Sequence, residues 1–397
     1  MDNSNTINYT DNSDYLPPTY LIENDVENYL LSFSIEQEDE YKSFFKKFGF
    51  VVIRDILNKK QCQKTIDDIL EYVESFKWAS YTAKESDKTI KRDDPKTWKT
   101  WPNLAAEGIV GYSPIFSDTT IENRSNPKIY DVYTQLLNRK DLYINHDRYG
   151  FFRPTKQVLH PFPQITPDHH VYHNKLKDES LSTSATATST KEDYENWKTV
   201  HNLHLDMNPF LFLEDENDEH RQKIFSTLNY KHGDSFFIEN NNPGSLKLDE
   251  LHIQGLINLC DNKDEDGGFI LVPGFHNHLE EWTKNNHSLK MKYGLHQDFI
   301  CVPPENKIYN QAIRITARAG SLILWNQKML HGSKPNNSGR PRLAMFVKMF
   351  PSTQIPKETL NRRCESIKES FEKHNNHPIE TSSLTDTQKK VLGLEFW

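Results

Sequence analysis

The chain has 397 residues, and its 48 Lys and Arg against 56 Asp and Glu give a formal net charge of -8. The charges lie in short mixed runs rather than in one basic block, which argues against nucleic acid or an anionic membrane as the main partner. No run approaches the roughly 20 apolar residues of a membrane span, and the four cysteines show neither a CxxC spacing nor a disulfide framework.

Residues 1–23 are rich in Asn, Asp, Ser and Thr and have few periodic apolar positions, so we expect a disordered tail. The first residues lack the charged and apolar regions of a signal peptide. The last residues are not a peroxisomal address of the SKL type. We therefore expect a soluble protein of the cytoplasm.

Residues 39–76 predict a helix, a short strand and a second helix. A face of phenylalanines precedes Gly49, which is expected to end the first helix. The β-type run at 50–53 predicts the strand, and Asn58 is the candidate N-cap of the second helix.

The aromatic, turn-rich stretch 93–114 is typical of a packed loop over a core or of a pocket wall. Residues 124–144 then predict a helix that leads into a strand. Arg153 and Trp325 lie in aromatic, strand-adjacent sequence and are candidates for a pocket. Arg148 and Arg153 could bind an anionic substrate, although structural ion pairs are the more frequent use of such arginines.

Four short β-type runs, with turn residues between them, dominate the second half of the chain. They favour an antiparallel barrel or a double-sheet jelly roll over an α/β fold, so we predict a mainly β protein with flanking helices. The domain is expected over 24–352, with polar surface insertions near 178–193 and 214–222. Residues 353–397 predict a C-terminal helical extension. The β-type runs are 251–261, 267–276, 312–326 and 342–350.

The stretch HNLHLDMNP, residues 201–209, has two interpretations. In a strand, side chains alternate, so His204 and Asp206 share one face as a two-ligand pair. In a helix, His201 would lie beside His204 instead. The β-type surroundings favour the strand. His201 is then expected to face the core or to contact a metal ligand without binding the metal itself. His169 and His170 are expected to be loop histidines.

A third ligand is expected from a distant strand, and the best candidate is His331. The turn residues 336–339 predict a tight hairpin. In that register His331 lies opposite Arg342, and Ser333 lies opposite Arg340, about 5 Å apart at the Cβ atoms. One face would then display an imidazole, a hydroxyl and two guanidiniums.

Two histidines and one carboxylate leave coordination positions open, as in non-haem Fe(II) oxygenases. A dicarboxylate can chelate such a metal at one end, while an arginine donates two hydrogen bonds to its far carboxylate and a serine hydroxyl donates another. The last open position can take oxygen.

At this point the sequence resembles the phytanoyl-CoA dioxygenase family of Fe(II)- and 2-oxoglutarate-dependent oxygenases. The resemblance rests on HLD at 204–206, DEDGGFILVPGFH at 264–276 and HGSKPNNSGRPRLAMF at 331–346. It extends from about Phe44 to Phe350.

The resemblance implies a double-stranded β-helix, which is a jelly-roll barrel, and His204, Asp206 and His331 as the catalytic iron ligands. It implies that Arg342 pairs with the 5-carboxylate of 2-oxoglutarate and that Ser333 is its hydroxyl partner. Family members use Fe(II), 2-oxoglutarate and O2, release succinate and CO2, and hydroxylate a C–H bond. Here the substrate is expected to be a small molecule or lipid-like. The intact carboxylate of Asp206 disfavours the halide-binding variant of this chemistry.

Two other functions stay open. The same three ligands could hold zinc with an activated water and hydrolyse an ester or a phosphate. The chain could also be a catalytically inactive, binding member of the same fold. The sequence does not decide the substrate, the oligomeric state, or whether Arg340 shares the 2-oxoglutarate site.

Overall fold

The structure is a computed structural model, and it describes residues 9–12, 15–75, 90–99, 106–111, 114–168, 190–214, 251–294, 299–355 and 357–397. Its α-helices are α1 (Glu38–Phe48), α2 (Lys59–Glu74), α3 (Asp118–Arg124), α4 (Pro127–Leu137), α6 (Pro209–Glu214), α9 (Leu279–Lys284), α10 (His287–Tyr293), α11 (Lys357–Asn375) and α12 (Asp386–Leu392). In the described ranges, no helix is long and apolar enough to cross a membrane.

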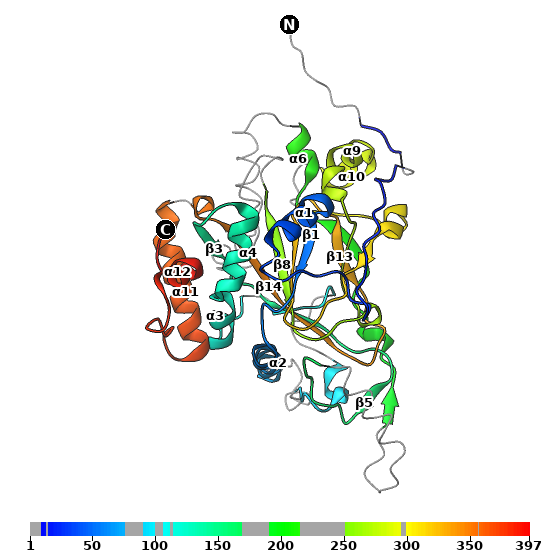
Figure 1. Cartoon of the computed structure of the whole chain (residues 1–397). Coiled ribbons are helices and arrows are strands. Elements are labelled where there is room, and N and C mark those ends of the chain that lie inside the picture. The colour runs from blue at the N-terminus through cyan, green and yellow to red at the C-terminus, as the bar shows by residue number, and fades with distance from the viewer. Residues whose placement is uncertain are drawn as a thin grey trace.

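The described strands form two large antiparallel sheets and a small two-stranded one (Figure 1). The seven-stranded sheet has the order β1 (Phe50–Ile53), β12 (Leu322–Asn326), β8 (Ile253–Asn258), β14 (Arg342–Pro351), β4 (Tyr149–Phe152) and β2 (Ile109–Val110), with β3 (Leu142–Ile144) also beside β14. The five-stranded sheet has the order β10 (Ile300–Cys301), β7 (Asn202–Leu205), β13 (His331–Lys334), β9 (Gly268–Leu271) and β11 (Ile313–Arg314). The small sheet pairs β5 (Val158–His160) with β6 (Thr190–Glu192). Antiparallel sheets with flanking helices confirm the coarse fold class expected from the sequence.

The local elements near the amino terminus follow the sequence pattern closely. Gly49 ends α1 in the left-handed region, at φ 78°, and its N–H donates to the carbonyl of Phe45. Asn58 caps α2 through a reciprocal capping box with Gln61. These predictions are confirmed because caps and apolar periodicity act over a few residues.

The two large sheets face each other. Phe269 of β9 and Trp325 of β12 bridge them, with ring centroids 4.3 Å apart. Along β14 the side chains alternate, so that Arg342 and Phe346 line the space between the sheets. Met345 belongs to the opposite face. The seven-stranded sheet is therefore covered on both faces.

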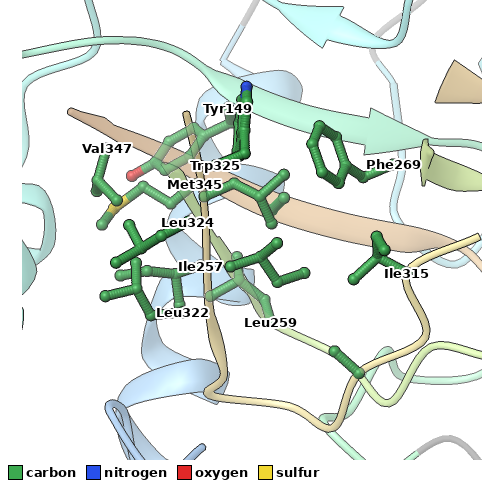
Figure 2. Packing of buried hydrophobic residues seen from close by; sticks show 14 of the residues in the cluster. Tyr149, Ile257, Leu259, Phe269, Ile315, Leu322, Leu324, Trp325, Met345 and Val347 are labelled. Carbon is green, nitrogen blue, oxygen red and sulfur yellow. The ribbon is translucent and has the colours of Figure 1, made fainter. Parts of the chain in front are cut away.

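The outer face of this sheet is apolar and packs under helices. Figure 2 shows Ile257, Leu324 and Met345 in one packed group. Tyr133 of α4 extends the contact, because its hydroxyl donates to the Val347 carbonyl at 3.0 Å. Burial of this apolar face stabilises the sheet.

The C-terminal helices α11 and α12 lie beside α3 and α4 on one side of the molecule (Figure 1). Arg363 of α11 is buried and donates to the Ile144 carbonyl at 3.0 Å. His146 bonds the Leu392 carbonyl at 2.9 Å. Near the end of the chain, Leu392 and Leu394 are buried, whereas the Phe396 side chain is exposed.

The amino-terminal segment differs from the expected disordered tail in the part that the structure describes. Thr10 donates from its backbone N–H to the Lys284 carbonyl, and Gln311 donates to the Pro17 carbonyl. Tyr20 lies edge-on against Phe48 at 5.8 Å. The aromatic side chains of this polar segment gain apolar partners on the body, which offsets the cost of ordering the chain.

The predicted hairpin over 331–346 is wrong. β13 and β14 belong to different sheets, and the turn residues between them connect the five-stranded sheet to the seven-stranded sheet. His331 pairs with His204 and Leu271, whereas Arg342 pairs with Phe152. A turn signal marks where the chain reverses, but the burial of each strand's own face selects its partner.

The expected polar insertions near 178–193 and 214–222 lie almost entirely outside the described residues, as do His169 and His170. At the end of the first insertion, Thr190–Glu192 form β6.

Candidate active site

A cavity of about 280 Å³ lies between the two sheets. His204, His331 and Ser333 line it from the five-stranded sheet, and Gln254 and Arg342 line it from the seven-stranded sheet. Glu107 and Ile109 also line it, so the stretch 93–114 contributes to the pocket wall as expected. The other lining residues are Asn145, Asp147, Arg148, Phe152, Asn202, Asp206, Gly255, Leu256, Phe269, Trp325, Gln327, Gly332, Phe346, Val347 and Lys348.

The stretch around His204 is a strand, which decides between the two interpretations of HNLHLDMNP. β7 ends at Leu205, and both His204 and Asp206 point into the cavity. His201 is exposed and sets its ring edge-on against Tyr309 at 5.2 Å, so it does not face the core.

The structure brings together His204, Asp206 and His331. Their candidate ligand atoms all lie within 4.8 Å of one another. The Nε2 atoms of His204 and His331 are each 3.5 Å from a carboxylate oxygen of Asp206. His331 lies directly opposite His204 across the β7–β13 pair, with ring centroids 4.4 Å apart. Two nitrogens and one carboxylate thus converge on one point.

Neighbouring groups orient these three side chains. His331 Nδ1 lies 2.9 Å from the Met329 carbonyl, which makes this nitrogen the donor and leaves Nε2 with a free lone pair. Gln254 donates to Asp206 Oδ2 at 2.8 Å, and its own oxygen accepts from Trp325 Nε1 at 2.9 Å. The carboxylate is thereby held in one rotamer.

The ionisation states suit metal binding. Burial and, to a smaller extent, the neighbouring His331 lower the pKa of His204 to about 4 against the opposing effect of Asp206, so the imidazole is neutral at pH 7. Burial alone would raise the pKa of Asp206. The two imidazoles and the hydrogen bond from Gln254 outweigh that effect and hold the pKa well below its ordinary value. A neutral imidazole and an ionised carboxylate are the forms that bind metals.

Arg342 is a cation at one end of the cavity that has no ion-pair partner among the described residues. Its side chain is buried, it lies over the Phe152 ring at 5.1 Å, and its Nε has no hydrogen-bond partner in the described part of the chain. Gly268 makes room for it, since a Cβ there would lie 2.8 Å from that Nε. Burial and the nearby Arg314 lower the pKa of Arg342 to about 9, which leaves it charged at pH 7. An orphaned buried guanidinium is suited to an anionic ligand.

Arg340 has a different environment. It donates to the carboxylates of Glu265 and Asp266, and the latter also accepts from Ser338 at 2.7 Å. It does not line the cavity. The arginine two residues away from Arg342 is therefore already neutralised by acidic side chains.

Ser333 lines the cavity, but its hydroxyl already has a partner. It donates to the Val200 carbonyl at 3.0 Å, and Asn202 Oδ1 lies 3.4 Å away. Only a rotation of this hydroxyl would let it donate to a ligand in the cavity.

Of the two pocket candidates from the sequence, Trp325 lines the cavity and Arg153 does not. Arg153 stacks over the Trp197 ring at 4.9 Å and donates to the Trp98 carbonyl, which is a structural use. Sequence reasoning missed Gln254 and Lys348. Each interrupts an apolar strand with a polar side chain, and that interruption was the available signal.

These residues fit a divalent metal with a chelating dicarboxylate. The two imidazoles and the carboxylate form a donor set that leaves coordination positions open. Arg342 offers an unpaired guanidinium in the same cavity.

Comparison with known proteins identifies relatives. Residues 220–344, which include His331 and Arg342, match the sequence model described as phytanoyl-CoA dioxygenase. A Dictyostelium discoideum protein named "Putative phytanoyl-CoA dioxygenase" is 31% identical, over 95% of this chain and 98% of that protein. The crystal structure of GlcNAc Inducible Gene 2 from Candida albicans aligns with a TM-score of 0.49 and 13% identity, over 91% of this chain and 79% of that chain. EctD from S. alaskensis, solved with 2-oxoglutarate and 5-hydroxyectoine, aligns with a TM-score of 0.37 and 14% identity, over 79% and 76% of the two chains.

Proposed function

This chain belongs to the phytanoyl-CoA dioxygenase family, and we propose that it is an Fe(II)- and 2-oxoglutarate-dependent dioxygenase that hydroxylates a small-molecule substrate. One observation carries the proposal. The same cavity is lined by a group of three potential metal ligands and by the buried guanidinium of Arg342, which has no ion-pair partner in the part of the chain that the structure describes. We also propose that the two facing sheets form the double-stranded β-helix typical of such enzymes.

His204, Asp206 and His331 would hold the iron. When bound, Fe(II) and 2-oxoglutarate supply the oxidising chemistry, in which O2 converts 2-oxoglutarate to succinate and CO2 and one oxygen atom enters a C–H bond of the substrate. Gln254 keeps the Asp206 carboxylate oriented, and the Met329 carbonyl keeps His331 in the tautomer that presents Nε2.

Arg342 would bind the far carboxylate of 2-oxoglutarate. The side chain of Arg342 packs against Gly268, which is three residues along β9 from Leu271, the partner of His331. A strand rises about 3.3 Å per residue, so these two levels are about 10 Å apart. This spacing suits a dicarboxylate that reaches from the metal ligands to the guanidinium. Arg340 has no part in this proposal, because Glu265 and Asp266 already neutralise it.

Aromatic side chains would restrict water between these two ends. Phe152, Phe269, Trp325 and Phe346 line the cavity, and all but Phe346 are almost completely buried. In a water-poor cavity the attraction between a guanidinium and a carboxylate is stronger than in bulk solvent. The same walls would protect a reactive centre from side reactions.

The test is an anaerobic titration of the purified protein with Fe(II) and then 2-oxoglutarate, which follows the weak visible charge-transfer absorption of the chelate. We expect the band in the wild type and its loss in His331→Ala. His201→Ala should keep the band, because His201 is exposed and lies outside the cavity. Iron binding without a 2-oxoglutarate band would overturn the proposal, and turnover of an ester with Zn(II) in the absence of O2 would replace it with hydrolysis.

A further inference from the structure

Lys348 is a second buried cation in the cavity, and the function proposed above gives it no role. Its side chain lies in β14 and lines the cavity, and the residue is only 5% exposed. Within the described ranges its ammonium group forms neither a hydrogen bond nor an ion pair. Burial lowers the pKa of Lys348 to about 8, while Asp206 and Asp147 offset part of the effect, so the charged form still prevails at pH 7. An unpaired buried ammonium is costly to keep and suggests a missing partner.

The position of Lys348 along β14 separates it from the 2-oxoglutarate site. Arg342 and Lys348 face the cavity from the same strand, six residues apart, which corresponds to about 20 Å. The iron ligands lie only about 10 Å from the level of Arg342 by the same strand rise. Lys348 pairs with Gln254, whose side chain reaches Asp206. Lys348 therefore lies at the Asp206 end of the cavity, about 20 Å along β14 from Arg342.

The walls around Lys348 hold its backbone, whereas its ammonium group has no ion-pair partner in the described part of the chain. The backbone N–H of Lys348 donates to Asn145 Oδ1 at 2.7 Å, and the backbone N–H of Asn145 donates to the Lys348 carbonyl at 2.8 Å. The nearby carboxylate of Asp147 accepts from the backbone N–H and from Nε of Arg148, at 2.7 and 3.1 Å. Glu107 also lines the cavity, but its side chain is exposed. Asp147 is matched by Arg148, and Asp206, the other carboxylate whose charge acts on Lys348, is one of the proposed metal ligands, so no described carboxylate is left for Lys348 alone.

We infer that Lys348 binds an anionic group of the substrate, a carboxylate or a phosphate, and thereby positions the substrate beside the iron ligands, at the end of the cavity away from Arg342. This inference rests on the proposed function and names the substrate class that it acts on, a small organic acid or phosphate ester. The partner that the ammonium lacks in the chain is then the substrate itself, and a neutral analogue leaves the charge unpaired.

The experiment uses three probes of equal chain length: hexanoate, hexyl phosphate and the neutral hexanamide. Each is titrated anaerobically into the full-length protein loaded with Fe(II) and 2-oxoglutarate, and the shift of the visible band is followed. We expect one of the two anions to bind with saturation and hexanamide to bind at least about ten-fold more weakly, as the loss of a charged hydrogen bond predicts. Which anion binds more tightly identifies the carboxylate or the phosphate.

Three variants isolate the role of the side chain. Lys348→Met keeps the approximate length of the side chain but removes its charge. It should weaken binding of the anion by roughly ten- to hundred-fold, while the dissociation constant of 2-oxoglutarate stays unchanged. Lys348→Arg should retain most of the affinity. Lys334→Met removes a lysine that is paired with Asp264 outside the cavity, and it should change nothing. Thermal unfolding checks that Lys348→Met is folded, which we expect because removal of a buried unpaired charge seldom destabilises a protein.

The outcomes separate the two proposals. Equal binding of hexanamide and the anions, no binding of either anion to the wild type, or weaker 2-oxoglutarate binding in Lys348→Met would each overturn the role of Lys348. To separate this role from the iron chemistry, the anions are also titrated into the Zn(II)-loaded protein while the intrinsic tryptophan fluorescence, to which the cavity residue Trp325 contributes, is monitored. If the visible band never forms but the anion still binds in a Lys348-dependent manner, the dioxygenase proposal fails and the anion site stands.

Discussion

His204 and His331 lie directly opposite each other on antiparallel strands, with ring centroids 4.4 Å apart, although one strand comes from the middle of the chain and the other from near its end. The metal-ligand group is therefore a product of the β7–β13 pairing. Any change that shifts this register moves one imidazole away from the other and from Asp206.

The first prediction concerns Gln254, which donates to Asp206 and accepts from Trp325. Gln254→Ala should lower the affinity for Fe(II) by about 10- to 100-fold, because loss of a hydrogen bond that orients a metal ligand typically has an effect of that size. Anaerobic metal titration of the variant and the wild type measures the effect. Gln63→Ala is a matched control, since this glutamine lies in α2 and bonds Asp67 instead. Equal affinities in the wild type and Gln254→Ala would show that Gln254 has only a packing role.

The second prediction compares two arginines that are neighbours in sequence. Arg342→Ala should raise the dissociation constant of 2-oxoglutarate by roughly 10- to 100-fold, because a charged hydrogen-bonding partner of its carboxylate is lost. Arg340→Ala should leave that constant nearly unchanged and instead destabilise the fold, because the buried carboxylate of Asp266 loses its cationic partner. The two constants come from the visible band, and the stability comes from urea unfolding. A reversed pattern would show that the cosubstrate site has been assigned to the wrong arginine.

The third prediction tests the close approach of β7 and β13. A Cβ on Gly332 would lie 1.9 Å from the Asn202 carbonyl oxygen, so the backbone has to move. Gly332→Ala should cost about 1–3 kcal/mol of unfolding free energy and should weaken metal binding, because the register next to His331 is disturbed. Gly150→Ala is the control, since the nearest atom there, in the Phe346 ring, is 3.5 Å away. Loss of metal affinity in both variants would argue against a specific role for the pairing.

The fourth prediction concerns acid stability. Burial lowers the pKa of His146 well below 6.5, and the nearby Arg124 lowers it further. Below pH 6.5 the unfolded chain therefore binds a proton that the folded chain does not, and stability is lost as the pH falls.

His146→Gln, which can keep the hydrogen bond to the Leu392 carbonyl, removes this contribution. The wild type should lose about 1 kcal/mol more unfolding free energy than the variant between pH 6.5 and 5.5. Urea unfolding at the two pH values measures the difference. Parallel losses in both proteins would mean that His146 is protonated in the folded state.

The sequence by itself determined the local elements. The helix that ends at Gly49 and the capped helix that begins after Asn58 could both be predicted, since caps and apolar periodicity depend on residues a few positions apart. Strand alternation likewise predicted that His204 and Asp206 share one face. The polar composition of residues 1–23 predicted a disordered tail. The structure differs there, since composition does not reveal long-range contacts such as that of Tyr20 with Phe48.

The tertiary structure alone decided which strands are neighbours. The asparagine turn predicted a hairpin between the segments of His331 and Arg342, yet these strands join different sheets. Only the folded chain distinguishes Arg340, which is neutralised by acidic side chains, from Arg342, which has no ion-pair partner within the described ranges, and only it brings Gln254 and Lys348 to the cavity. The physical reason is that alternation specifies which face of a strand is buried, whereas the partner that buries it is selected by long-range packing of the whole chain.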